Sequence, residues 1–313
     1  MSTNMPEAAT GAGSLFGLVQ ETAFGVTPAT PALQRIRTRP ITFNPEAENF
    51  LRSQEIGNGR MPTAHRRVFE SGTIRVPTTL IYGNTDDILA GIVGGSWNAN
   101  ILTMGQTPRS YTGELHRQDA ATPYFVKGVG CFFNSFELQA GADGNEPSLL
   151  TLNGIVKEIS AENATVDAAG GYDSPVANDE ILNGQWNFQV DGGDFEIIAM
   201  TLNFQDNRNA KRILGSNTPA GFNRGAGGRR LSGTLTGYAE NKGHIDRWKQ
   251  ETESSITAVA TDTAGNALTI SIPRWKAGNV SETGDEGEVR FEMPFEAYDP
   301  SGQTLFSLTR ASA

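Results

Sequence analysis

The chain contains two stretches that resemble one another, and this internal repeat constrains the fold more than any single motif does. Both stretches have the order strand, loop, strand, short helix, and their Ser-Gly-Thr triplets, which begin at Ser71 and Ser232, lie 161 residues apart. The first copy consists of Ile41-Thr42-Phe43-Asn44, Ser71-Gly72-Thr73-Ile74 and Asn84-Thr85-Asp86-Asp87-Ile88-Leu89. The second consists of Met200-Thr201-Leu202-Asn203, Ser232-Gly233-Thr234-Leu235 and Asn241-Lys242-Gly243-His244-Ile245-Asp246. A duplicated unit favours pseudo-symmetric assembly over a unique active site, the alternative being a chance similarity between two β-rich stretches.

The length of 313 residues suffices for two domains, each with a core of its own. Residues 159–182 are rich in Ala, Gly, Asp and Asn and show little periodicity, which is typical of a connection between domains. We therefore predict a flexible N-terminal arm at 1–14, a first domain at 15–160, a linker at 161–182 and a second domain at 183–313.

Alternation of apolar and polar residues predicts a mainly β protein with antiparallel sheets that have one solvated face. The clearest examples are residues 185–190, 198–204, 268–272 and 290–296. Turn residues such as Asp191-Gly192-Gly193-Asp194 separate the predicted strands. Helix signals occur at two places only: Asn84 or Thr85 is a candidate cap for one short helix, and Asn241 for another, with Ile245 and Trp248 facing inward.

Charge and hydropathy exclude several classes of protein. No apolar run approaches the about 20 residues that cross a bilayer, and residues 1–13 lack the features of a secretory signal, so we expect a soluble protein without a membrane partner. The net charge of −10 opposes binding to the outside of nucleic acid. Residues 161–313 carry most of this surplus, with 13 basic and 21 acidic side chains.

No catalytic or metal-binding constellation is recognisable. His65, His116 and His244 lack the spacing of metal ligands, and a solvated or capping role is expected for His244. The single cysteine, Cys131, excludes an internal disulfide and is expected to be a small buried hydrophobe. We therefore predict no enzyme activity and no cofactor. One alternative is a hydrolase built on the acidic residues 282–296, but such a dense cluster is more typical of a solvated surface.

Two long basic loops, 57–70 and 215–230, occupy the same position in each repeat, between the Thr-x-Asn strand and the Ser-Gly-Thr strand. Long loops in a compact protein are usually functional. A basic loop on an otherwise acidic body favours head-to-tail docking between copies of the chain over nucleic-acid binding. The residues predicted to make such ring-stacking contacts are Arg60, Arg66, Arg67, Arg224, Arg229 and Arg230.

Several motifs, taken in their order along the chain, resemble the tail tube protein of long, non-contractile-tailed bacteriophages (siphoviruses). They are Glu21-Thr-Ala-Phe-Gly25-Val-Thr27-Pro28-Ala-Thr-Pro31, Ser71-Gly-Thr-Ile-Arg-Val-Pro followed by Tyr82-Gly83 and Asp86-Asp87, then Asp262-Thr-Ala-Gly-Asn266, Ile272-Pro273-Arg274 and Asp299-Pro300. The similarity extends from about residue 15 to the C-terminus.

The resemblance implies a structural virion protein without catalytic residues. It implies two tandem β-sandwich or barrel-like tube domains, each with one short flanking helix, whose strands complete a closed barrel between subunits. Rings of subunits would stack into a tube that holds the tape measure protein, meets tail terminator and tail-tip proteins, and passes DNA during infection. Assembly would take place in the bacterial host cytoplasm, and the product would be part of the virion tail.

The doubled arrangement exceeds the single tube unit of many relatives. Because family tubes present six equivalent positions per ring, a trimer with pseudo-sixfold symmetry is favoured, and a hexamer is the alternative. An acidic channel would repel DNA and let it slide. Glu292 and Glu296, on the polar side of a predicted strand, are the candidate channel-lining residues. A competing class is a secreted or surface β-sandwich carbohydrate-binding module, but neither a signal sequence nor an exposed aromatic platform is evident.

Overall fold

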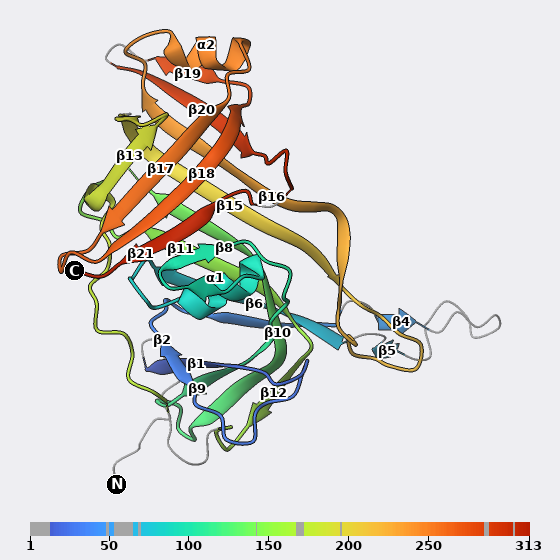
Figure 1. Cartoon of the computed structure of the whole chain (residues 1–313). Helices are drawn as coiled ribbons and strands as arrows, with labels where there is room; N and C mark the ends of the chain where they lie inside the picture. The colour runs from blue at the N-terminus through green and yellow to red at the C-terminus, as the bar shows by residue number, and fades with distance from the viewer. Residues whose placement is uncertain are drawn as a thin grey trace.

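The protein is a mainly β structure built around one large open sheet (Figure 1). The computed structural model describes residues 13–47, 50–52, 65–67, 70–141, 143–166, 172–194, 196–284, 288–302 and 304–313. Ladder pairings connect strands in the order β3-β6-β11-β10-β15-β16-β20-β18-β17-β13, all antiparallel. Within these residues the pairings do not return to their starting strand. The predicted antiparallel β fold is confirmed, whereas the sheet of a single chain is not a closed barrel.

The first half of the chain contributes twelve strands and one helix to the described structure. Its elements are β1 (Ser14–Gln20), β2 (Gln34–Ile36), β3 (Thr42–Ala47), β4 (Phe50–Arg52), β5 (His65–Arg67), β6 (Glu70–Thr79), α1 (Asp86–Val93), β7 (Trp97–Asn98), β8 (Ile101–Thr103), β9 (Tyr111–Arg117), β10 (Tyr124–Ala140), β11 (Leu149–Val156) and β12 (Glu158–Glu162).

The second half contributes nine strands and one α-helix, preceded by a short 3-10 turn at Asn183–Gln185. Its elements are β13 (Trp186–Val190), β14 (Gly193–Asp194), β15 (Ile197–Ala210), β16 (Phe222–Tyr238), α2 (Gly243–Lys249), β17 (Ser254–Thr261), β18 (Ala267–Ala277), β19 (Ser281–Gly284), β20 (Val289–Ala297) and β21 (Ser307–Ala311).

The two halves have the same strand order. In the first half, neighbouring strands are β1-β9-β10-β11-β6-β3, with β12 added to the start of β10. In the second half they are β13-β17-β18-β20-β16-β15, with β21 added to the start of β18. The helices also occupy equivalent places in the chain: α1 follows β6 in the first half, and α2 follows the equivalent strand β16 in the second half. The two Ser-Gly-Thr triplets do not occupy equivalent ladder positions: Asn44 faces Thr73 whereas Asn203 faces Ser232, so the triplets are offset by two residues.

The halves are joined where the end of β10 pairs with β15. This ladder runs from Ser135 opposite Gln205 to Ala140 opposite Met200. On its buried side Phe136 stacks on Phe204 with 5.5 Å between ring centroids, and Phe306 packs against both rings. Apolar burial at this junction makes the two portions of the sheet continuous.

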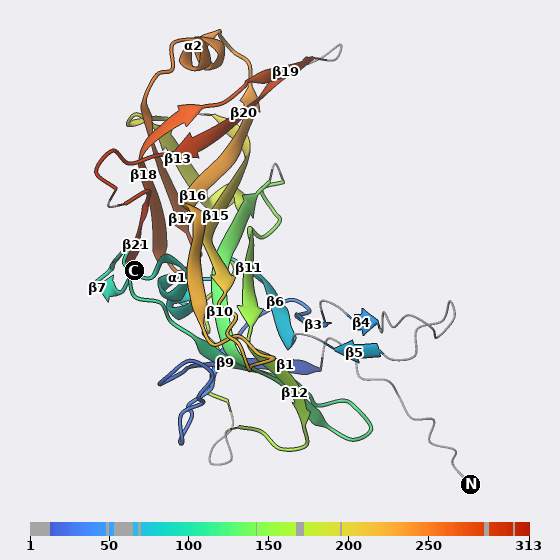
Figure 2. The same cartoon turned by 90° about the vertical axis from the view of Figure 1, so that its right-hand side faces the viewer.

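Both helices belong to the side of the sheet that carries the core. In Figure 2, α1 lies to one side of β10 and β11. The residues Ile88–Val93 of α1 are all buried, and the Tyr111 hydroxyl donates to the Asp87 carbonyl over 2.6 Å. The helix ends at Gly94, whose φ of 64° lies in the left-handed region that favours glycine. Helix α1 is therefore fixed by packing on the apolar face, whereas α2 contacts that face through His244, which stacks on Phe291, and Arg247, which lies over Trp275.

The N-terminal caps differ from the prediction. Thr85 occupies the cap position of α1 without a side-chain hydrogen bond, and the Asn84 amide instead exchanges two hydrogen bonds with the Arg37 backbone. In α2 the cap position is Lys242, although Asn241 accepts from the Gly243 N–H as expected of a capping side chain.

Several expectations about the second repeat were wrong. Residues 222–230 belong to strand β16, because its pairing with β15 continues to Phe222, so only the connection before it is a loop. His244 is buried rather than solvated, since its ring stacks on Phe291 at 4.7 Å and its Nε2 lies 2.6 Å from a Glu282 oxygen. Trp248, expected to face inward, is 37% exposed.

The segment between the halves returns along the first half. Its backbone hydrogen-bonds to Leu33, Leu80 and Ser148. A buried carboxylate, Glu114, also accepts from the Thr165 hydroxyl, the Val166 N–H and the Tyr172 hydroxyl at 2.7–2.8 Å. Most of the predicted 1–14 arm lies outside the described residues, and Ser14 begins β1.

Candidate functional site on the polar face of the sheet

The face of the sheet opposite the helices is covered by polar side chains. One row of directly paired residues crosses six neighbouring strands, from β11 through β10, β15, β16 and β20 to β18. Its members are Thr151, Glu137, Asn203, Ser232, Glu296 and Lys276. Side chains alternate between the two faces of a strand, so the residues directly before and after each member of this row point into the core. The result is a continuous wall of hydroxyl, amide and charged groups.

Strand β20 illustrates this division. Phe291, Met293 and Phe295 are buried, whereas Glu292 and Glu296 are exposed. The alternation expected for this strand is thus confirmed. Sequence alternation identified the polar side of β20, but it did not predict that the polar sides of strands from both halves form one surface.

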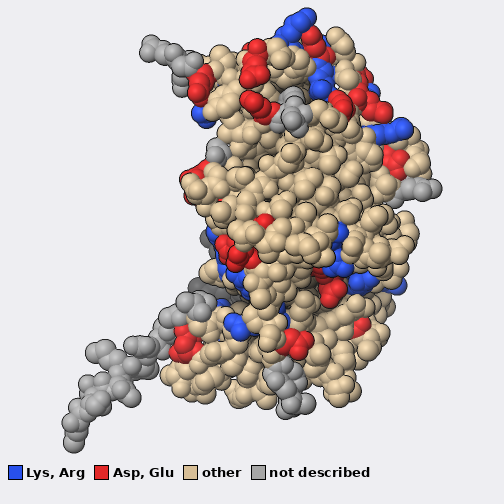
Figure 3. Space-filling model, turned by 60° about the vertical axis from the view of Figure 1, so that its left-hand side comes forward, with Lys and Arg blue, Asp and Glu red and all other residues tan. Residues whose placement is uncertain are grey.

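Acidic and basic side chains are mixed on this face. Arg230 donates from Nη2 to Glu296 Oε2 over 2.9 Å, and both side chains are more than half exposed. Arg75 of β6 and Arg290 of β20 are exposed on the same side as Glu292. Charges of the two signs are also interspersed, without a large field of either sign, on the view of the molecule in Figure 3.

Arg229 lies in a different environment from its neighbour. Its side chain is 15% exposed, and its Nε is 3.6 Å from Asp206 Oδ1. Arg208 Nε lies 2.7 Å from the other oxygen of Asp206, in an ion pair whose atoms are not aligned as a hydrogen bond. These three buried or largely buried groups tie β15 to β16, so Arg229 has a structural role within the chain.

Two open hollows on the polar face occupy equivalent places in the two halves. The first, of about 450 Å³, is lined by residues that include Asn44, Thr73 and Asn153. The second, of about 640 Å³, is lined by residues that include Asn203, Ser232 and Pro294. The strand equivalence of the halves therefore extends to the shape of this surface.

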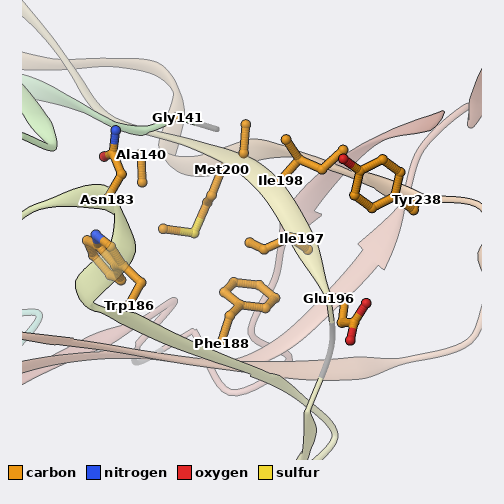
Figure 4. Close-up of a pocket in the computed structure, with 11 residues that line it drawn as sticks. Ala140, Gly141, Asn183, Trp186, Phe188, Glu196, Ile197, Ile198, Met200 and Tyr238 are labelled. Carbon is orange, nitrogen blue, oxygen red and sulfur yellow. The ribbon is translucent and has the colours of Figure 1, made fainter. Parts of the chain in front are cut away.

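A separate hollow of about 380 Å³ lies between β13 and the start of β15 (Figure 4). Trp186, Phe188 and Met200 give it apolar walls, and Tyr238 lies on its opposite side. Among the lining residues that the structure describes, Glu196 is the one carboxylate, and they include no histidine or cysteine. This lining offers packing surface but no pair of groups for acid–base chemistry.

Other expected sites can also be placed. Cys131 is fully buried, and this burial raises the pKa of its thiol, in agreement with a hydrophobic role. In the described part of the chain, no three His, Cys, Asp or Glu side chains gather in a way that could hold a metal ion. Neither described helix has the length and apolar character needed to cross a membrane.

A comparison with protein families matches residues 11–297 to the family described as phage tail tube protein. The chain belongs to the phage tail tube protein family. A search of curated proteins finds no match. The resemblance inferred from ordered motifs is thus confirmed, and it identifies this tail tube protein as a structural component of the virion tail.

Those predicted ring-stacking arginines of this tail tube protein that the structure describes lie in two strands, β5 and β16. Arg60 lies outside the described residues, and Arg66 and Arg67 belong to β5, which pairs with β4. Arg224 belongs to β16 rather than to a loop. Arg229 and Arg230 are in the same strand and pair with carboxylates of their own chain, a result that sequence spacing could not reveal.

Proposed function

We propose that this tail tube protein closes into rings by joining sheet edges between copies, and that the rings stack into the tube of a siphovirus tail. The observation that carries this proposal is the open ten-strand sheet with helices on one face and an unbroken polar row on the other. An open sheet leaves rows of N–H and C=O groups at its edges, and closure with sister molecules satisfies them.

The polar face would line the channel, with Glu292 and Glu296 among its residues. Hydroxyl and amide groups keep such a wall hydrated, and carboxylates repel DNA phosphates. Because Arg230 neutralises Glu296 locally, the electrostatic repulsion would come from the balance of the whole face and not from these two glutamates alone. The net charge of −10 is consistent with a lumen through which DNA passes without being held.

Two tandem tube domains per chain would allow a trimer to fill six pseudo-equivalent ring positions. The identical strand order of the halves supports this stoichiometry over a hexamer of full-length chains. The two domains proposed from sequence, 15–160 and 183–313, would supply these positions, and the connection between them follows β12 (Glu158–Glu162) and precedes β13 (Trp186–Val190).

The paired strands β3 and β6 form one two-stranded ribbon, and β15 and β16 form another. The ends of these ribbons that extend beyond the rest of the sheet would contact the adjacent ring. Arg60, Arg66, Arg67 and Arg224 remain candidates for contacts to acidic groups of the adjacent ring. Arg229 and Arg230 are withdrawn from this role, since their charges are already paired within the chain.

The remaining partners follow from the family role. The lumen would hold the tape measure protein during assembly in the bacterial host cytoplasm, and the tube ends would meet tail terminator and tail-tip proteins. DNA would pass through the completed tube during infection.

Electron microscopy of the purified, concentrated protein tests this function. We expect hollow tubes of stacked rings, and the mass of isolated rings should equal three chains. A protein that stays monomeric at every concentration, and is absent from the tails of virions, would refute the tube function. Rings of six full-length chains would reject the trimer and retain the function.

A further inference from the structure

The junction between the two halves of one chain offers a template for the junction between two chains. Inside the chain, the end of β10 pairs with β15 of the second half. The repeat equates β10 with the β18–β19 segment and β15 with β3. An equivalent junction would therefore place β19 of one copy beside β3 of the next.

The equivalence of β10 with β18–β19 extends to single residues. Against β9, β10 has a register shift between Gly128 and Cys131; against β17, β18 has one between Ile272 and Trp275. A second register shift follows in each case. In β10 it lies between Phe133 and Ser135, where the strand pairs with β11. In the β18–β19 segment it lies between Ala277 and Ser281, where the segment pairs with β20. Superposing these irregularities equates residues 135–140 with residues 279–284.

Both strand edges needed for this contact are open in the described residues. Strand β19 pairs only with β20, and β3 pairs only with β6. Residues 281–284 are all exposed, as are Thr42 and Asn44 of β3. On α2, His244 contacts Glu282 and stacks on Phe291, which holds β19 in place beside β20. A fixed, extended and unpaired edge is suited to strand addition.

The ribbon extensions repeat the same relationship. Beyond the internal junction, the β15–β16 ribbon continues over the first half, where Phe222 packs on Phe132 and Phe24 at 4.6 and 5.1 Å. The β3–β6 ribbon continues into β4 and β5, which pair only with each other in the described structure and project from the body (Figures 1 and 2). Its position is that of an arm directed toward another molecule.

We propose that the partner of the β19 edge is the β3 edge of a second copy of this chain, paired antiparallel in the register of the β10–β15 junction. The internal pair Glu137–Asn203 then predicts Ser281 opposite Asn44, and Gln139–Thr201 predicts Thr283 opposite Thr42. The contact is head to tail, so it can close a ring. This inference rests on the proposed tube function and adds the edges and the register to it.

Disulfide trapping tests the register directly. In assembled Asn44→Cys/Ser281→Cys protein, oxidation should link chains covalently into a ladder of oligomers that ends at the number of copies in the ring. The chain's own Cys131 is buried and so does not compete. Glu137→Cys/Asn203→Cys is the positive control, because it should form the same bond within one chain.

The matched negative control is Asn44→Cys/Glu292→Cys. Glu292 of β20 is paired with Ser281 of β19, so the thiol at position 292 would lie one strand further from the partner, about 10 Å away. If tubes form and the positive control is oxidised, equal cross-linking of the two intermolecular pairs, or none by Asn44→Cys/Ser281→Cys, overturns the proposed edges and leaves the tube function intact. If wild-type protein never assembles, the function itself fails.

A second variant covers the case in which the double cysteine protein does not assemble. Thr283→Pro removes an N–H from β19 and obstructs strand addition, whereas Arg35→Pro alters β2, which also has one paired neighbour in the described residues and lies outside this junction. We expect Thr283→Pro to give a folded monomer with the wild-type circular dichroism spectrum and at least tenfold less tube at the same concentration. Tube formation unchanged from wild type would overturn the inference.

Discussion

The guanidinium of Arg230 donates a hydrogen bond to the carboxylate of Glu296 over 2.9 Å, across the ladder of β16 and β20. One of these residues was expected to stack rings and the other to line a channel. Their contact assigns both to the same polar face, and it separates Arg230 from Arg229, whose partner Asp206 lies among largely buried groups.

Replacing the two neighbouring arginines should therefore have unequal effects on folding. Arg230→Ala removes a pair whose members are more than half exposed, so the free energy of unfolding should fall by less than about 1 kcal/mol. Arg229→Ala leaves the 5% exposed Asp206 side chain with fewer partners and should cost about 1–3 kcal/mol. Urea unfolding of the monomer measures both, and equal losses would contradict the structural role of Arg229.

Glu114 should control how firmly the segment between the halves is held. The carboxylate is fully buried and accepts hydrogen bonds from Thr165, Val166 and Tyr172. Glu114→Ala leaves these donors without that acceptor, so cleavage of residues 163–182 in limited proteolysis should accelerate at least fivefold. The exposed Glu158→Ala is the control. Unchanged cleavage in Glu114→Ala would show that the other contacts suffice.

Alternation and turn residues predicted the strands of the second half well, because each strand has one buried face. The pattern Phe291, Met293, Phe295 required burial on one side whatever the partner strand was. Ordered motifs identified the family. These features depend on local sequence, which the chain displays directly.

What the sequence could not predict depends on contacts between distant residues. Residues 222–230 are rich in Gly and Arg, which suggests a loop, yet pairing with β15 makes them a strand. His244 is polar and close to a helix start, but Phe291 and Glu282 bury its ring. The continuity of the polar face likewise requires knowledge of which strands are neighbours.

The Asp191 carboxylate should make stability depend on pH. Burial tends to raise its pKa, but hydrogen bonds from the Ser255 N–H and Arg247, both at 2.7 Å, have the larger combined effect and lower it below 3.8. A lowered pKa gives stability that is present above the unfolded value and is lost as the pH falls through the folded value. Asp191→Asn tolerates the same left-handed backbone, with its φ of 55°.

The difference in unfolding free energy between wild type and Asp191→Asn should be below about 1 kcal/mol at pH 7, because the carboxylate is 43% exposed. It should shrink as the pH falls from 3.8 through the lower pKa of the folded carboxylate, below which both side chains are neutral. Thermal melting of the monomer from pH 7 to pH 2.5 measures it. A difference that is constant over this range would exclude ionisation as its source.

Charge reversal on the polar face should change how the assembled tube interacts with DNA. Glu137 and Glu292 lie on this face, on β10 and β20 respectively. In Glu137→Lys/Glu292→Lys tubes, two cations per chain would contact phosphates in the lumen. We expect DNA retention that weakens with salt, with the slope of log K against log salt steeper by roughly 0.9 for each additional phosphate that a lysine neutralises.

The matched control reverses two exposed carboxylates of the connecting segment, Asp173→Lys/Asp179→Lys, which lie near Leu33 and Thr263 respectively rather than on the polar row. Both variants change the net charge of a chain by four, so only position differs between them. Fluorescent DNA that is protected from nuclease after mixing with tubes reports retention inside the channel. Selective retention by Glu137→Lys/Glu292→Lys supports a luminal polar face, whereas equal retention by the two variants means that the face points elsewhere.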